Sequence, residues 1–196
     1  MSGHGTGGDY PRGVKIGVDV GMVRVGVASS DSDSLLATPV RTLKRDLKKK
    51  SDLFILIREI IERDAVQVFV GLPRNLSGTE SASAEMARGY AQELANAIGR
   101  AGLTASVRLI DERLSTVSAH RSLRQAGLNT RNHRKVVDQV AAVEILQHAM
   151  DMQRSQMRDV GDLVDARRRD HPQGDPLTPT KEPVITENTR ERNPEL

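Results

Sequence analysis

The chain has 196 residues, of which 37% are hydrophobic and 28% charged, and its formal net charge is +3. This balance is typical of a soluble domain, and no apolar run approaches the length of a membrane helix. Cysteine is absent, which excludes disulfides and thiolate zinc sites.

Charge is unevenly distributed along the chain. Residues 1–156 carry 22 basic and 17 acidic side chains, whereas residues 157–196 carry 7 and 9. The part expected to fold is therefore the basic part, which favours a polyanionic partner. Aromatic residues make up only 2% of the chain, so few side chains could stack on bases. If the partner is a nucleic acid, we expect its backbone and shape to be recognised more than its bases.

Strands and helices are expected to alternate along the chain. Residues 1–13 are polar and Gly-rich, which indicates a flexible leader without an apolar signal region, and a cytoplasmic location follows as the default. Hydrophobic periodicity and turn residues predict the elements that follow. Strands are expected over 15–20, 25–29, 40–43, 65–71 and 105–110, and helices over 46–63, 79–100, 115–125 and about 134–152.

This order predicts one α/β domain over residues 14–156, with a five-stranded mixed sheet flanked by helices. Short connections favour an antiparallel meander for the first three strands, and the two later strands, each reached through a helix, are expected to run parallel to the first. Residues 157–196 are rich in proline and mixed charges, which indicates a disordered tail. Ligand chemistry in such a sheet gathers at the carboxyl ends of the parallel strands.

Three acidic positions interrupt apolar segments near that edge. Asp19 lies within a β-branched strand, Glu112 closes another strand together with Asp111, and Asp138 begins an apolar helix face. A buried acid is costly unless a cation pairs with it. Oxygen ligands without histidine or thiolate suit Mg²⁺ or Mn²⁺, which could activate a water and stabilise the leaving oxygen of a phosphodiester.

Each acid also has a structural interpretation. Asp19 could begin a turn, Asp111 or Glu112 could complement a helix dipole, and Asp138 could cap a helix or pair with Arg134. Neighbouring strand residues point to opposite faces of a sheet, so only one of Asp111 and Glu112 needs to face the site. The residue pattern leaves open which one does.

Basic side chains are expected close to the acids, where they could hold phosphates or could be ordinary solvated surface. The arginines predicted near the carboxyl ends of the parallel strands are Arg24, Arg74 and Arg113. A polar, basic loop is expected just before Asp138, and its candidate nucleic-acid contacts are Arg131, Arg134 and Lys135.

Four short motifs occur in a fixed order over about residues 15–152. They are Gly17-Val18-Asp19-Val20-Gly21, Val70-Gly71-Leu72-Pro73, Asp111-Glu112-Arg113-Leu114-Ser115-Thr116 and Val137-Asp138 with Ala141-Ala142. Together they resemble the YqgF/RuvX family of bacterial, RNase H-like nucleases related to Holliday junction resolvases. One difference is Met22-Val23, which stands in a turn where small polar and basic residues are common in the family.

The resemblance implies an RNase H-like fold and divalent-metal catalysis by Asp19, Glu112 and Asp138. It also implies maturation of the 5′ end of pre-16S ribosomal RNA, and Holliday junction resolution is proposed for such proteins too. The sequence therefore predicts a metal-dependent endonuclease acting on structured RNA. Two alternatives remain: a resolvase that cuts branched DNA as a homodimer, and a non-catalytic, RNA-binding ribosome-assembly factor. An actin-like ATPase, which shares the Asp-x-Gly turn, would need two such domains and a longer chain.

Overall fold

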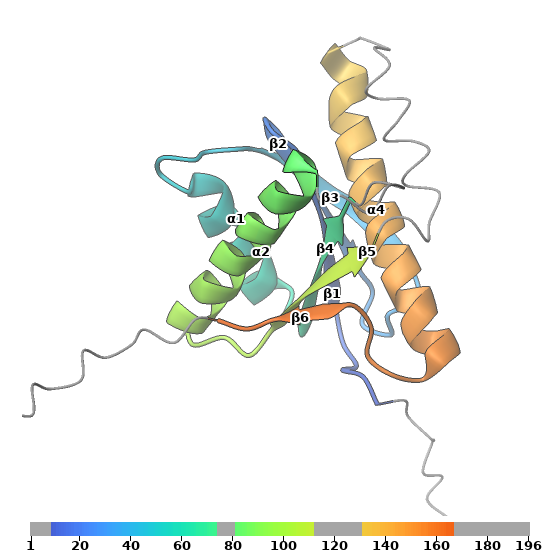
Figure 1. Ribbon diagram of the computed structural model, residues 1–196. Helices are drawn as coiled ribbons and strands as arrows, with labels where there is room; N and C mark the ends of the chain where they lie inside the picture. Colours follow the sequence, from blue (N-terminus) through green and yellow to red (C-terminus); the bar gives the residue numbers. More distant parts are fainter. Residues whose placement is uncertain (1–8, 74–80, 112–130, 167–196) are drawn as a thin grey trace, which may run out of the picture.

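The computed structural model describes residues 9–73, 81–111 and 131–166. They form a mixed sheet with helices on both faces (Figure 1). The strands are β1 (Lys15–Val20), β2 (Arg24–Ser30), β3 (Ala37–Lys44), β4 (Gln67–Leu72), β5 (Ser106–Asp111) and β6 (Asp162–Val164). The helices are α1 (Ser51–Glu62), α2 (Ala82–Arg100) and α4 (Arg131–Gln156). None of these three helices is long and apolar enough to cross a membrane.

The strand order is β3-β2-β1-β4-β5-β6. Strands β1, β2 and β3 form an antiparallel meander, and β4 and β5 add in parallel beside β1. Both features confirm the predicted RNase H-like α/β arrangement, because short turns permit hairpins and the helical crossover returns each new strand in parallel. The carboxyl ends of β1, β4 and β5 therefore lie at one edge of the sheet.

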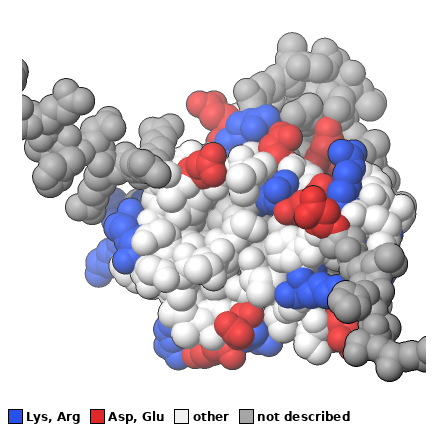
Figure 2. Space-filling view, turned by 90° about the horizontal axis from the view of Figure 1, so that it is seen from below, with Lys and Arg blue, Asp and Glu red and all other residues white. Residues whose placement is uncertain are grey.

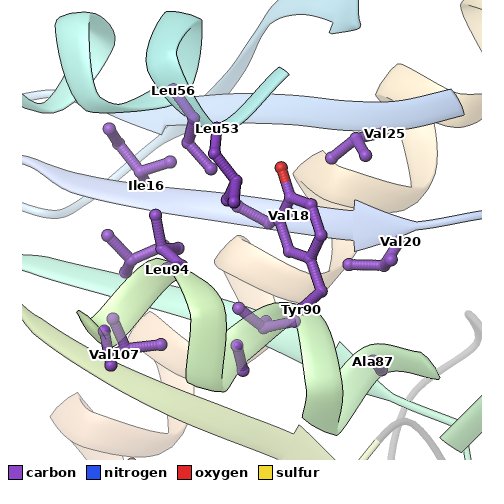
Figure 3. Close-up of a cluster of buried hydrophobic side chains, with 14 of the residues drawn as sticks. Ile16, Val18, Val20, Val25, Leu53, Leu56, Ala87, Tyr90, Leu94 and Val107 are labelled. Atoms are coloured by element: carbon purple, nitrogen blue, oxygen red, sulfur yellow. The ribbon is translucent and has the colours of Figure 1, made fainter. Parts of the chain in front are cut away.

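Alternation along β1 divides its side chains between two cores. Ile16, Val18 and Val20 point toward α1 and α2 and pack with residues such as Tyr90 and Leu94 (Figure 3). The intervening positions face α4 on the other side of the sheet. This division explains why an almost continuous apolar strand can carry an acid: Asp19 occupies an α4-facing position.

Helix α4 lies unusually close to the sheet because two glycines face it. A Cβ atom added to Gly17 would lie 2.5 Å from the carbonyl oxygen of Ala142 and 2.6 Å from Cβ of Leu146. A Cβ added to Gly26 would lie only 2.0 Å from the carbonyl oxygen of Asp138. Both distances are too short for real Cβ contacts, so the positions of these glycines allow the helix backbone to rest on β1 and β2.

Several boundaries differ from the prediction. Helix α1 begins at Ser51 rather than near residue 46, because the Asp46 carboxylate accepts the backbone N–H groups of Lys48 and Lys49 in a separate turn. Helix α2 is capped by Ser81, whose hydroxyl accepts from the Ala84 N–H. The expected helix at 115–125 lies outside the described residues. Helix α4 begins at residue 131, within the range predicted as a basic loop.

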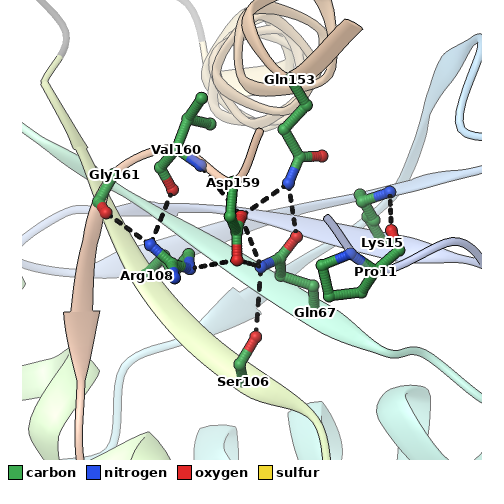
Figure 4. Close-up of polar contacts among 9 residues, drawn as sticks. All are labelled: Pro11, Lys15, Gln67, Ser106, Arg108, Gln153, Asp159, Val160 and Gly161. Carbon is green, nitrogen blue, oxygen red and sulfur yellow. Dashed lines mark hydrogen bonds and ion pairs between the residues drawn. The ribbon is translucent and has the colours of Figure 1, made fainter. Parts of the chain in front are cut away.

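The described residues form six strands where five were predicted, because residues 162–164 pair antiparallel with β5. The new strand comes from the range assigned to the charged tail. A polar network joins it to the sheet (Figure 4): Asp159 pairs with Arg108 at 2.9 Å and accepts from the amides of Gln67 and Gln153. Arg108 also donates to the carbonyl of Gly161 at 2.6 Å. These contacts, together with the packing of Val160 and Val164 against the two cores, hold β6 in place.

Lys15 is a buried cation beside this network. Its side chain is fully inaccessible to solvent, and its ammonium donates to the Ser34 hydroxyl at 2.7 Å and to the Pro11 carbonyl at 2.9 Å. Burial lowers the pKa of Lys15 to about 8, and the charge of Asp159 only partly opposes this shift. In the unfolded chain the ammonium keeps its ordinary pKa near 10.5.

This difference predicts that the protein gains stability in mild alkali. Between pH 8 and pH 10 the unfolded chain binds more protons at Lys15 than the folded chain, so the free energy of unfolding rises with pH. Relative to Lys15→Met, whose stability lacks this term, we expect the free energy of unfolding of wild type to rise by about 2 kcal/mol from pH 7 to pH 10. Urea unfolding at several pH values measures this, with the exposed Lys44→Met as the control. Parallel pH curves for wild type and Lys15→Met would contradict it.

Candidate active site

The hairpin of β1 and β2 places Asp19 on the α4 face of the sheet. Asp19 is only 5% exposed. Its Cα partner on β2 is Gly26, so both positions face the same way. Asp138 lies directly over Gly26, since its carbonyl oxygen, carbonyl carbon and Cβ are the nearest atoms to the space a Cβ would fill there. Two acids 119 positions apart in the sequence therefore come together at the carboxyl end of β1.

Arg24 contacts one of these two acids, Asp138. Its Nε donates to Oδ2 of Asp138 at 2.6 Å, and both side chains are partly buried. Arg24 shares a face with Gly26 because the two are separated by one residue on β2. Asp138 thus has a partner from the sheet, and the contact fixes the orientation of its carboxylate.

The pairing of the parallel strands β4 and β5 indicates which face of the sheet Asp111 belongs to. Asp111 pairs with Leu72, which packs into the core beneath α1 and α2. Cα partners on adjacent strands share a face, so Asp111 belongs to the face opposite Asp19. Ile110, one residue earlier, packs with α4 instead. Alternation therefore argues against Asp111 as a partner of Asp19. Glu112 itself lies outside the described residues.

Only part of the predicted site falls within the described structure. Asp19, Arg24 and Asp138 are brought together. Arg74 and Arg113, like Glu112, lie outside the described residues. Arg131, Arg134 and Lys135 belong to the first turns of α4 rather than to a loop, and their side chains are not among those described. Within the described ranges, no three acidic or histidine side chains form a metal-binding group.

Sequence reasoning missed Arg45, which supports the turn after Asp19. Its backbone N–H donates to the Val23 carbonyl at 2.9 Å, and its guanidinium donates to the Gly21 carbonyl at 3.2 Å. The guanidinium lies 5.1 Å from the centre of the Tyr90 ring and 4.0 Å from the Asp52 carboxylate. Burial, reinforced by Asp52, raises the pKa of Tyr90 far above its usual range, so the phenol stays neutral. In the sequence, only the acid Asp52 at the start of an apolar helix indicated such a cluster.

The antiparallel meander and the two parallel strands added beside β1 define an RNase H-like fold. The chain belongs to the RuvX family, because the family model described as "RuvX: Holliday junction resolvase" matches residues 13–152. This result confirms the resemblance drawn from the four motifs.

Curated relatives support the same assignment. A protein of Mycolicibacterium smegmatis named "Putative pre-16S rRNA nuclease" is 51% identical over 152 residues, which cover 76% of this chain and 87% of the relative. A protein of Frankia casuarinae with the same name is 50% identical over 141 residues, covering 72% of this chain and 68% of the relative. Among solved structures, Thermus thermophilus RuvC in complex with a Holliday junction substrate matches with a TM-score of 0.45 and 15% identity, covering 78% of this chain and 100% of that chain.

Proposed function

We propose that this protein is a metal-dependent endonuclease that hydrolyses phosphodiester bonds in the maturation of the 5′ end of pre-16S rRNA. The observation that carries the proposal is the meeting of Asp19 and Asp138 over Gly26 at the carboxyl edge of β1. The relatives named for pre-16S rRNA at about half identity support the substrate. Such a substrate would place the protein in the cytoplasm.

The acids fit a hard divalent cation. Asp19 and Asp138 offer carboxylate oxygens in a partly buried site, which is the donor type that Mg²⁺ and Mn²⁺ prefer. Glu112 is the third acid we assign, since Asp111 belongs to the other face of the sheet. When bound, the cation would lower the pKa of a water and stabilise the charge on the leaving oxygen.

Basic side chains would position the RNA. Arg24 holds the Asp138 carboxylate and keeps further N–H donors for a phosphate oxygen. We assign Arg74 and Arg113 to the scissile phosphate, and Arg131, Arg134 and Lys135 to the flanking backbone. Recognition of this kind is independent of sequence, which agrees with the scarcity of aromatic side chains.

The description of the family model favours a second candidate, resolution of Holliday junctions. Such an activity cuts two strands symmetrically and needs two active sites, hence a homodimer. The two candidates differ in substrate and in oligomeric state, whereas a ribosome-assembly factor without activity would bind RNA and leave it intact.

Cleavage of a pre-16S 5′-leader RNA and of a four-way DNA junction, assayed side by side, tests the proposal. We expect the RNA to be cut in Mg²⁺ or Mn²⁺ and to stay intact in EDTA, because the carboxylates need a cation to act on a phosphodiester. Symmetric cutting of the junction alone, together with a dimeric solution mass, would replace the proposal with the resolvase. Metal-independent binding without cleavage of either substrate would favour the assembly factor.

A further inference from the structure

The turn between β1 and β2 exposes two apolar side chains beside the candidate site. Met22 is 83% exposed and Val23 64% exposed. They follow Asp19 by three and four residues and immediately precede Arg24, which contacts Asp138. We call these two residues the apolar tip. Hairpin turns usually carry Gly, Asn or Asp, so a methionine and a valine here need an explanation other than turn formation.

The apolar tip is held firmly. The Gly21 N–H donates to the Arg24 carbonyl at 2.8 Å and closes the turn beneath the tip. Arg45 binds the carbonyls on both sides of Met22, those of Gly21 and Val23, while its guanidinium is fixed over the Tyr90 ring. A mobile loop could fold its apolar side chains away from water, but this turn is braced from inside the protein. The exposure of both side chains is therefore a built feature of the hairpin.

Several basic side chains lie in the elements next to the apolar tip. Arg24 is partly exposed on one side, and Arg45 connects the tip to a segment in which Lys44, Lys48 and Lys49 are exposed, with Asp46 as the one acid among them. The lower end of the molecule, seen in Figure 2, instead carries acidic and basic side chains interspersed around an uncharged area. An apolar projection next to mostly cationic side chains is complementary to one partner in particular, a polynucleotide, which offers anionic phosphates beside apolar base faces.

We propose that the apolar tip packs against bases next to the scissile phosphate and holds them out of their stack. The proposal rests on the nuclease function above and deepens it by naming how the site selects RNA. Exposed aromatic side chains usually fill this role. Here Phe69 and Tyr90 are buried and the exposed Phe54 lies on α1, on the face of the sheet opposite the acids, whereas Met22 is the most exposed large apolar side chain among the described residues. The protein would then prefer phosphates at the border between paired and unpaired RNA, where unstacking costs least.

Cleavage by a Met22→Ser/Val23→Ser variant tests this role. The substrates are a leader RNA in which a complementary strand pairs the bases beside the cut, and the same RNA unpaired. We expect the variant to lose about tenfold or more in rate on the paired substrate and less than about threefold on the unpaired one, since only the first requires unstacking. The matched control is Ile61→Ser on α1, which removes an apolar side chain of 54% exposure away from the site.

A second measurement does not need cleavage. The readout is the fluorescence of an RNA that carries 2-aminopurine beside the cut. This fluorescence should increase when the Asp19→Asn protein binds the RNA, and the increase should be lost when Met22 and Val23 are also changed to serine. Rescue of both readouts by Met22→Leu/Val23→Ile would confirm that apolar bulk is what matters. Equal loss on both substrates, or an increase in fluorescence that survives the serine changes, would overturn the role of the tip. Failure of wild type to cut any RNA would instead overturn the nuclease function itself.

Discussion

Asparagine in place of Asp19 is expected to reduce RNA cleavage by about 10³-fold or more while leaving RNA binding nearly unchanged. The amide would keep the shape of the side chain but lose the negative charge that a divalent cation requires, and charge stabilisation is commonly the largest contribution to catalysis. The phosphate contacts that we propose come from basic side chains, which this change leaves in place. Single-turnover cleavage in Mg²⁺ and fluorescence anisotropy with labelled RNA measure the two effects separately.

The stability of the Asp19→Asn protein shows whether a loss of cleavage reflects lost catalysis or misfolding. Asp19 is buried, and asparagine has nearly the same size and shape, so the change leaves no cavity and forces no overlap. Asp19→Asn should therefore unfold at a urea concentration close to that of wild type. Asp33→Asn, which changes an exposed aspartate, serves as the control and should retain full activity. Wild-type cleavage by the Asp19 variant would rule out the assigned mechanism.

Alanine in place of Gly26 should destabilise the protein by about 3 kcal/mol or more and should also impair cleavage. The added Cβ would lie 2.0 Å from a backbone oxygen of α4, and a helix backbone cannot move aside as the end of a flexible side chain can. The helix must shift as a unit, and Asp138 would shift with it. Urea unfolding measures the first effect, and the cleavage assay measures the second.

Gly89→Ala provides a matched control, because this change should raise the free energy of unfolding instead of lowering it. Gly89 lies within α2, and nothing lies within 4 Å of an added Cβ. Alanine there should raise the free energy of unfolding by about 0.5–1 kcal/mol, because it restricts the unfolded chain and favours helix. If Gly26→Ala were as stable and active as Gly89→Ala, then α4 would not rest on β2 as described.

The five predicted strands follow from the sequence because each is a short β-branched or apolar run bounded by turn residues, a pattern set by local physics. Strand β6 could not be found in this way. It has three residues, two of them exposed, and it is held by Asp159 pairing with Arg108 from a distant strand. Interactions across about 50 residues leave no periodicity that a local reading could detect.

The candidate site was predictable to the extent that its residues conflict with their surroundings. Asp19 and Asp138 each stand among apolar residues, so the sequence alone marked them as unusual. The contact of Arg24 with Asp138 and the support from Arg45 to the turn depend on the packing of α4 and α2 against the sheet. An arginine in such a place has the same appearance in sequence as one on a solvated surface.

The described chain begins and ends at two separate places, both away from the carboxyl ends of β1, β4 and β5 (Figure 1): residue 166 lies beside Gly99 of α2. Asp9 exchanges backbone hydrogen bonds with Met157 and Asp159, and Asp159 contacts Gln67, the first residue of β4. Asp19 and Asp138, by contrast, meet at the carboxyl end of β1. A fluorophore or surface tether attached directly at residue 9 or at residue 166 would therefore sit away from Asp19 and Asp138. These two positions suit immobilised or single-molecule assays in which a large folded RNA is presented to the carboxyl ends of the parallel strands.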